Sequence, residues 1–100
     1  MKTIIEEKNG GVVVSVQGEL DTNTSIQFHR DIEPLMERKD THVEMDLSKL
    51  DYVSSKALRI IVAFQQAVLK NGGSFSITKV TDTVREVFDM TGLSASFLRD

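Results

Sequence analysis

The chain has 100 residues, 40% of them hydrophobic and 27% charged, with a formal net charge of −3 at pH 7 and no cysteine. This length predicts a single domain over residues 1–100, and the missing cysteine excludes disulfides, thiolate metal sites and cysteine nucleophiles. The negative charge disfavours nucleic acid as a partner, because phosphate binding requires a basic face. The sequence shows no signal peptide and no apolar run of about 20 residues. We therefore expect no membrane insertion, and the absence of cysteine fits a cytoplasmic location.

A β-hairpin over residues 3–8 and 11–18 is the first predicted element. Asn9-Gly10, between the two strands, is a strong signal for a two-residue hairpin turn. The second strand alternates between apolar and polar residues, which predicts one buried face. The apolar positions are Val12, Val14 and Val16.

A helix is predicted next, over residues 22–38. Four apolar residues repeat there at helical spacing, and three residues near its start are candidate N-caps. Pro34 removes one backbone hydrogen bond and clashes with the preceding turn, at a cost of roughly 3 kcal/mol in a helix interior. The helix either kinks near Arg30 or stops before Pro34 and restarts, and the continuing apolar stripe favours the kink. The apolar residues are Phe28, Ile32, Leu35 and Met36, and the cap candidates are Asp21, Thr22 and Thr24.

The second half of the chain alternates between strands and helices. Residues 43–48 alternate apolar and polar side chains and predict a strand, followed by a loop over residues 49–53. A helix then begins at Ser54-Ser55 and ends before Gly72. The remaining predicted elements are a strand over 74–77, a helix from Thr81 to Gly92 and a final short strand over Ala95–Leu98.

The predicted order of elements is therefore β-β-α-β-α-β-α-β. Repeated alternation of helix and strand after a hairpin favours right-handed crossovers between parallel strands. We predict an α/β (α+β) fold, in which a mixed, mainly parallel sheet carries an N-terminal hairpin and has helices packed on at least one face.

Catalytic chemistry has little support in the sequence. The two histidines, His29 and His42, form no Ser/His/Asp arrangement and no pair with metal-ligand spacing. The glycine pairs lack the Lys-Ser/Thr that a phosphate loop requires. Asp21, Asp46 and Asp51 follow or end strands, where carboxylates usually cap helices and turns. We therefore predict a protein that is not an enzyme and that has no cofactor, no metal site and no catalytic residue.

Two adjacent serines, Ser54 and Ser55, stand at the predicted start of the second helix. Serine is a preferred N-cap residue, and either hydroxyl fits this role. The other is well placed to carry a phosphate, because free N–H groups and the helix dipole stabilise an anion in the first turn. Phosphorylation would add about −1.5 to −2 charges to an exposed surface and repel a partner that buries the neutral hydroxyl.

Four short motifs follow one another along the chain: Gly18–Asp21, Asp46–Ser48, Tyr52–Leu58 and Val84–Leu93. They are similar to a G-E-L-D after a hairpin, a D-L-S at the end of the third strand, a phosphorylation motif and a late helix with a Gly-Leu stop. In this order and spacing the sequence resembles the STAS domains, and within them the single-domain anti-sigma factor antagonists.

The resemblance implies a partner switch in which the protein is a ligand and a substrate. In its unphosphorylated form such a domain binds an anti-sigma factor, a serine kinase of the GHKL type, and so releases the sigma factor. The kinase phosphorylates the serine that aligns with Ser55, with Ser54 as second choice, and a PP2C-type phosphatase removes the phosphate. The implied partner-binding residues are Leu20, Asp21, Thr22, Asn23, Ser54, Ser55, Lys56 and Arg59.

Three residues depart from the family's phosphorylation motif. Ser54 stands where aspartate is frequent, Lys56 where a small residue is common, and Ala57 in place of glycine. The weakened motif keeps open a second function, a STAS subunit of an ABC-type lipid transporter that binds its ATPase. A third is a scaffold subunit of a stressosome-like assembly, which predicts a large particle where the antagonist predicts a monomer or weak dimer. The chain also ends at Asp100, without the final helix that many members carry.

Overall fold

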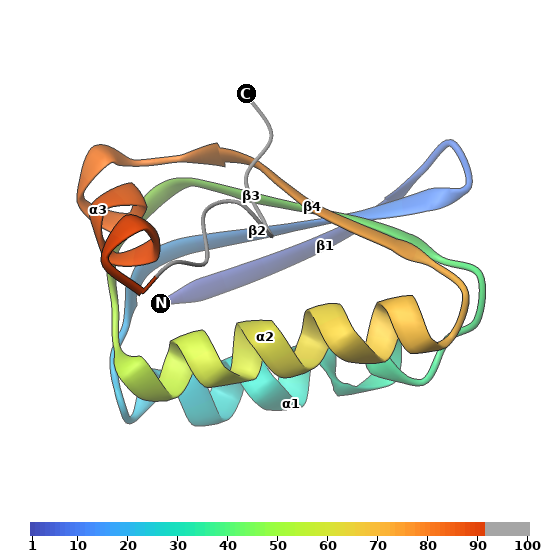
Figure 1. Ribbon diagram of the computed structural model, residues 1–100, viewed down its shortest axis with the longest axis horizontal. Helices are drawn as coiled ribbons and strands as arrows, with labels where there is room; N and C mark the ends of the chain where they lie inside the picture. Colours follow the sequence, from blue (N-terminus) through green and yellow to red (C-terminus); the bar gives the residue numbers. More distant parts are fainter. Residues whose placement is uncertain (92–100) are drawn as a thin grey trace.

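The structure is a computed structural model that describes residues 1–91, in which four strands alternate with three helices after a hairpin (Figure 1). The elements are β1 (Lys2–Lys8), β2 (Gly11–Leu20), α1 (Thr24–Met36), β3 (His42–Val53), α2 (Ser55–Lys70), β4 (Ser74–Val80) and α3 (Asp82–Thr91). The strands form one mixed sheet in the order β1-β2-β3-β4, in which β1 is antiparallel to β2 and the other neighbours are parallel. The predicted fold class is confirmed, and so is the element order as far as α3. The predicted strand over Ala95–Leu98 lies outside the described residues.

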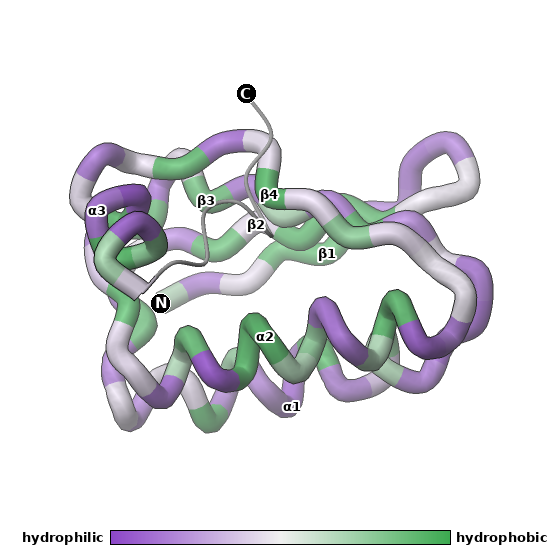
Figure 2. The backbone as a smooth tube through the Cα atoms, in the orientation of Figure 1, coloured by the Kyte–Doolittle hydropathy of each residue, from purple (hydrophilic) through white to green (hydrophobic). Residues whose placement is uncertain are grey.

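Helices α1 and α2 lie side by side on one face of the sheet, and α3 lies at one end of it (Figure 1). Hydrophobic residues recur along α2, which gives this helix one apolar face for the sheet (Figure 2). Phe28, Phe64 and Phe88, one from each helix, are fully buried. Burial stabilises the fold by roughly 1.5–3 kcal/mol for each such side chain. Phe64 also meets Phe75 of β4 edge to face, with ring centroids 5.3 Å apart.

The β1–β2 hairpin turns at the predicted residues. Asn9 and Gly10 have positive φ values of 50° and 79°, as a two-residue turn that matches the twist of the strands requires. Lys8 and Gly11 form the last pair of the ladder before this turn. The predicted hairpin and its turn at Asn9-Gly10 are therefore confirmed.

Helix α1 is uninterrupted from Thr24 to Met36, so the alternative in which it stops before Pro34 and restarts is wrong. Pro34 lies in the last turn of the helix, and the buried side chain of Leu35 follows it directly. Burial of Leu35 holds this turn in the helix despite the backbone hydrogen bond that proline removes.

Strand β3 continues through residues 49–53, where the sequence predicted a loop. The pairing with β2 shifts twice in this region, between Ser15 and Gln17 and between Gly18 and Glu19, and each shift inserts one extra residue into β3. Such bulges interrupt the alternation of side chains between the two faces of a strand. The buried residues of β3 are consequently spaced by three after Leu47, which hid the strand from a search for period two. Strand β4 likewise extends to Val80 instead of Ile77.

Thr81 directly precedes α3 and caps it, as predicted. Its hydroxyl oxygen accepts a hydrogen bond from the Val84 N–H at 3.4 Å, and its hydroxyl donates to the Leu50 carbonyl at 2.8 Å. Val84 and Phe88 of this helix are fully buried. Thr81 thus ties α3 to the extended part of β3, close to the end of the sheet where the candidate site lies.

Candidate functional site

The ends of β2 and β3 bring together the two segments that the sequence singled out. The strands are parallel, so both end at the same edge of the sheet, where Leu20 pairs with Val53. One residue later the Ser54 N–H donates to the Leu20 carbonyl at 2.8 Å. Helices α1 and α2 both begin at this edge, which we call the switch end of the molecule (Figure 1).

Ser54 is the N-cap of α2. Its backbone is extended, with φ −84° and ψ 165°, and its Oγ accepts a hydrogen bond from the Ala57 N–H at 3.1 Å. The residue is only 8% exposed. Its hydroxyl oxygen therefore serves as the helix cap. It supplies a partner for one of the four N–H groups that the first turn of a helix leaves without one.

Ser55 is the first residue of α2, and unlike Ser54 it is exposed. Its hydroxyl takes part in no hydrogen bond within residues 1–91. Beside it lies a shallow, mainly apolar groove of about 340 Å³. The residues that line the groove are Ser55, Leu58, Arg59, Val62 and Thr91.

Two exposed cations, Lys56 and Arg59, flank Ser55 on α2. Neither forms an ion pair with another residue in the described part of the chain. The helix contains no acidic residue between Ser55 and Lys70. The only charged residues in the first turns of α2 are therefore cations, on a protein whose net charge is negative.

The segment between β2 and α1 is held by its own hydrogen bonds. An Asp21 carboxylate oxygen accepts from the Thr24 N–H at 2.8 Å and from the Thr24 hydroxyl at 3.1 Å. The first of these bonds is the main reason why the pKa of Asp21 lies below its ordinary value. Asn23, the N-cap residue of α1, makes no side-chain capping bond. Of the three predicted cap candidates, Asp21 is the one whose side chain accepts a hydrogen bond from the first N–H of the helix.

Two of the predicted partner-binding side chains do not lie on the surface. Leu20 is fully buried, because it belongs to the inward face of β2, and only its carbonyl reaches the switch end. Ser54 is nearly buried by its capping bond. The exposed members of the predicted set are Thr22, Asn23, Ser55, Lys56 and Arg59, with Asp21 half-buried.

Ala57, at the position where glycine is usual, has its methyl group inside the core and is fully buried. The substitution therefore adds nothing to the surface at the start of α2. Alanine also favours the helix by roughly 1 kcal/mol relative to glycine. The departure from the motif at Ala57 thus affects the stability of the first turn of α2 and not the surface that this turn presents.

Sequence reasoning gave no binding role to two exposed apolar side chains at the switch end. Tyr52, near the end of β3, is 47% exposed, and Ile26, in the first turns of α1, is 46% exposed. Large apolar side chains that remain in water are candidates for burial by a partner. Ile26 could have been found from the sequence, because it stands off the stripe that Phe28 and Ile32 define.

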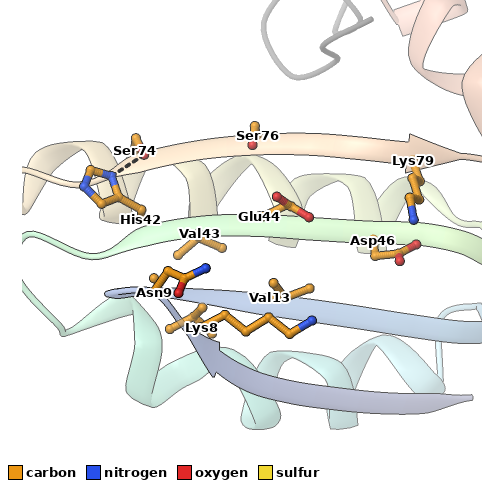
Figure 3. A pocket seen from close by; sticks show the side chains of 12 residues that line it. Lys8, Asn9, Val13, His42, Val43, Glu44, Asp46, Ser74, Ser76 and Lys79 are labelled. Atoms are coloured by element: carbon orange, nitrogen blue, oxygen red, sulfur yellow. Dashed lines mark hydrogen bonds between the residues drawn. The ribbon is translucent and has the colours of Figure 1, made fainter.

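The face of the sheet opposite α1 and α2 carries a second depression, lined by polar side chains of three strands (Figure 3). His42 Nδ1 lies 2.6 Å from Ser74 Oγ, and Glu44, Asp46 and Lys79 follow along the same face. Among residues 1–91 no three His, Cys, Asp or Glu side chains are grouped in a way that could hold a metal ion. The other histidine, His29, is exposed on α1.

Comparison with known proteins places this architecture. Residues 2–99 match the STAS domain family. The chain belongs to the STAS domain family. Within residues 1–91, none of the helices of this STAS domain has the length and apolarity that a membrane span requires.

The relatives of this STAS domain carry names from one regulatory class. It is 27% identical over 90 residues to the anti-sigma F factor antagonist of Paenibacillus polymyxa, an alignment that covers 89% of this chain and 77% of the relative. An anti-sigma factor antagonist from Mycobacterium paratuberculosis superposes with a TM-score of 0.86 at 28% identity, over 97% of this chain and 83% of that one. The Bacillus antagonist SpoIIAA shares the fold, with TM-scores of 0.83 unphosphorylated and 0.77 phosphorylated, at 20% and 19% identity. Those two alignments each cover 99% of this chain, and 87% and 90% of SpoIIAA.

Proposed function

We propose that this STAS domain is an anti-sigma factor antagonist whose binding is switched off by phosphorylation of Ser55. The unmodified domain binds an anti-sigma factor and thereby releases a sigma factor for transcription. The observation that carries the proposal is that the two serines differ in hydrogen bonding and exposure. Ser54 caps α2, and Ser55 presents an exposed hydroxyl that has no partner within residues 1–91. The names of the relatives, and the two phosphorylation states in which SpoIIAA has been solved, support the same function.

Ser55 has the chemistry of a phosphoacceptor. Its oxygen attacks the γ-phosphorus of a nucleoside triphosphate held by a serine kinase, for which the GHKL-type anti-sigma factor is the proposed enzyme. The Oγ–P bond forms, and the bond between the γ-phosphorus and the oxygen that bridges it to the β-phosphate breaks. The nucleoside diphosphate leaves, and the hydroxyl proton passes to a base of the kinase. Ser54 is a poor acceptor, because its modification would remove the bond to the Ala57 N–H and expose a buried cap.

The binding surface is the switch end, where the exposed residues of both helix starts converge. Thr22 and Asn23 come from the approach to α1, and Lys56 and Arg59 from α2, so the two segments form one face around Ser55. A phosphate there adds about −1.5 to −2 charges in the middle of the contact. A PP2C-type phosphatase removes the phosphate in the proposed cycle. The domain itself is proposed to be cytoplasmic and either monomeric or weakly dimeric.

Affinity capture from a lysate of the source organism tests this function. Wild type, Ser55→Ala and Ser55→Asp serve as parallel baits, and bound proteins are identified by mass spectrometry. We expect a GHKL-type kinase on wild type and Ser55→Ala, and its loss from Ser55→Asp. An ABC-transporter ATPase held equally by all three baits would overturn the proposal, and so would elution of the protein as a large assembly.

Phosphate uptake from the captured kinase identifies the acceptor. Ser55→Ala should abolish it, whereas Ser54→Ala should retain it, because its effect is confined to the helix cap. If Ser55→Ala takes up as much phosphate as wild type, the acceptor is a hydroxyl other than that of Ser55.

A further inference from the structure

We infer that Arg59 binds the phosphate of phosphorylated Ser55, so that the modification is neutralised within α2. The inference rests on the proposed function, because that function supplies the phosphorylation of Ser55. The geometry of the pair concerns this chain alone. The family resemblance implies that Arg59 binds a partner, but neither the phosphorylation motif nor the names of the relatives assign it a role toward the phosphate.

Ser55 and Arg59 are placed to meet. They are four residues apart on α2, and side chains at this spacing are neighbours on one face of a helix. Both line the same shallow groove, together with Leu58, Val62 and Thr91. Lys56 is one residue from Ser55, and adjacent residues on a helix do not face each other.

Among the described residues, Arg59 has no competing partner near this groove. Within residues 1–91 it forms neither an ion pair nor a side-chain hydrogen bond, and α2 offers it no carboxylate. Its planar guanidinium can donate two parallel hydrogen bonds to phosphate oxygens, a geometry that lysine lacks.

The pairing would change the charge that the switch end presents. Unmodified, the start of α2 carries two exposed cations, Lys56 and Arg59. A phosphate with about −1.5 to −2 charges brings this pair close to neutrality. A partner with an acidic surface then loses its attraction to Arg59, in addition to meeting a bulky modified serine.

Titration of the phosphate by phosphorus NMR tests the pairing. Phosphoserine is introduced at position 55 of the full chain by genetic encoding, so that no kinase is needed. We expect the second pKa of the phosphate to be higher in Arg59→Gln than in the unsubstituted chain by about 0.3 of a pH unit, the shift that one helical ion pair produces. The difference should shrink in 1 M salt, because the pair is exposed.

Lys70→Gln is the matched control, because it removes one positive charge from the same helix. Lys70 lies 15 residues from Ser55, which is roughly 22 Å along a helix and more than twice the Debye length at physiological salt. Lys56→Gln should change the phosphate pKa less than Arg59→Gln does. The acids at the same end, Glu19, Asp21 and Asp51, are common to all variants and cancel in the comparison.

Two results would overturn the inference: an unchanged phosphate pKa in Arg59→Gln, or a larger shift in Lys56→Gln. Far-UV circular dichroism and the melting temperature of unmodified Arg59→Gln should match those of wild type, because Arg59 is exposed and has no ion pair within residues 1–91. Since the phosphate is installed without a kinase, the titration reports on Arg59 even if capture yields no anti-sigma factor. The capture experiment fails or succeeds independently of the titration.

Discussion

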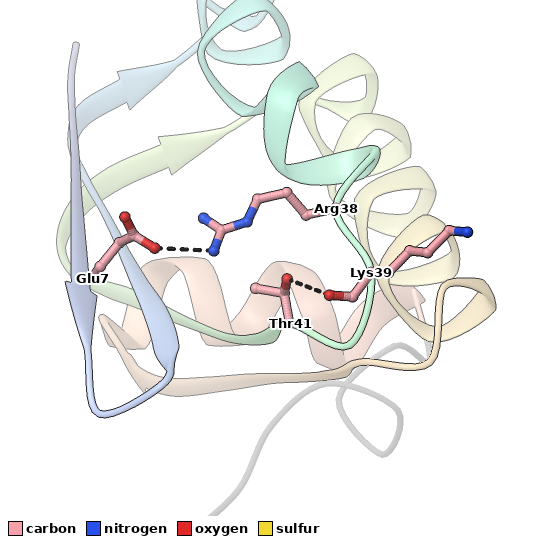
Figure 4. Close-up of polar contacts among 4 residues, drawn as sticks. All are labelled: Glu7, Arg38, Lys39 and Thr41. Atoms are coloured by element: carbon pink, nitrogen blue, oxygen red, sulfur yellow. Dashed lines mark hydrogen bonds and ion pairs between the residues drawn. The ribbon is translucent and has the colours of Figure 1, made fainter.

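The two ends of the sheet differ in how their polar groups are used. At the end opposite the switch end, which we call the closed end, Arg38 pairs with Glu7 at 2.9 Å, and the Thr41 hydroxyl donates to the Lys39 carbonyl (Figure 4). The Asp40 N–H donates to the Asn71 carbonyl there at 2.9 Å. At the switch end, by contrast, the Ser55 hydroxyl and two cations remain without partners in the described chain. The contrast is therefore between Arg38 and Thr41, which are paired within the molecule, and Ser55, Lys56 and Arg59, which have no partner among residues 1–91.

The largest effect is expected from a substitution at the closed end, Gly73→Ala. A Cβ atom at Gly73 would overlap the Thr41 carbonyl oxygen, which is backbone and cannot swing away, and would touch Val68 at 3.0 Å. We expect a loss of about 3 kcal/mol in the free energy of unfolding, measured by urea denaturation, since overpacking of this kind costs about that much.

Gly10→Ala is the control for Gly73→Ala. Gly10 has a positive φ of 79°, but no atom lies within 4 Å of the position that an alanine methyl group would take there. The only penalty is therefore backbone strain of about 1 kcal/mol. Equal losses in the two variants would show that the closed end is less tightly packed than its geometry indicates.

The second prediction separates the two serines by stability rather than by phosphorylation. Ser54→Ala removes the acceptor of the Ala57 N–H and should lower the free energy of unfolding by about 1 kcal/mol. Ser55→Ala should stay within about 0.5 kcal/mol of wild type, because its hydroxyl has no partner among the described residues. Thermal unfolding of both variants decides this, and a larger loss from Ser55→Ala would reverse the roles assigned to the two hydroxyls.

The contrast between the ends also explains what the sequence could predict. Asn9-Gly10, Thr81 and the valines of β2 act through local rules of turns, caps and alternation, and the structure confirms them. The strand over residues 49–53 escaped prediction because two bulges against β2 remove its alternation, and a bulge depends on the neighbouring strand.

The site shows the same limit. The sequence located the two serines but left open which one caps the helix, since either fits the local pattern. The choice is made by tertiary contacts, because the bond from the Ser54 N–H to the Leu20 carbonyl fixes where the strand ends and the helix begins. Burial of the Leu20 side chain was missed for a related reason, since β2 continues to the last residue before the turn.

The third prediction compares the paired arginine of the closed end with Arg59 of the switch end. Arg38 and Glu7 are both substantially exposed, at 44% and 71% of their side-chain surface, so their ion pair is partly screened by solvent. Arg38→Gln should cost about 0–1 kcal/mol of stability and less in high salt. Arg59→Gln should be neutral in the same denaturation assay, and a clear destabilisation would mean that Arg59 is part of the fold.

The smallest effect is a pH dependence that originates at the switch end. The Thr24 N–H, assisted by the Thr24 hydroxyl and opposed in part by desolvation, lowers the pKa of Asp21 below its ordinary value of 3.8. A carboxyl whose pKa is lower in the folded state stabilises the fold above its unfolded pKa, and this contribution is lost as the pH falls through the folded pKa. Asp21→Asn should therefore be less stable than wild type near neutral pH and approach it below pH 3.8. Denaturation curves from neutral pH downward measure the free energy of unfolding of both proteins. If the difference between Asp21→Asn and wild type does not change with pH, Asp21 acts through its shape alone and not through its charge.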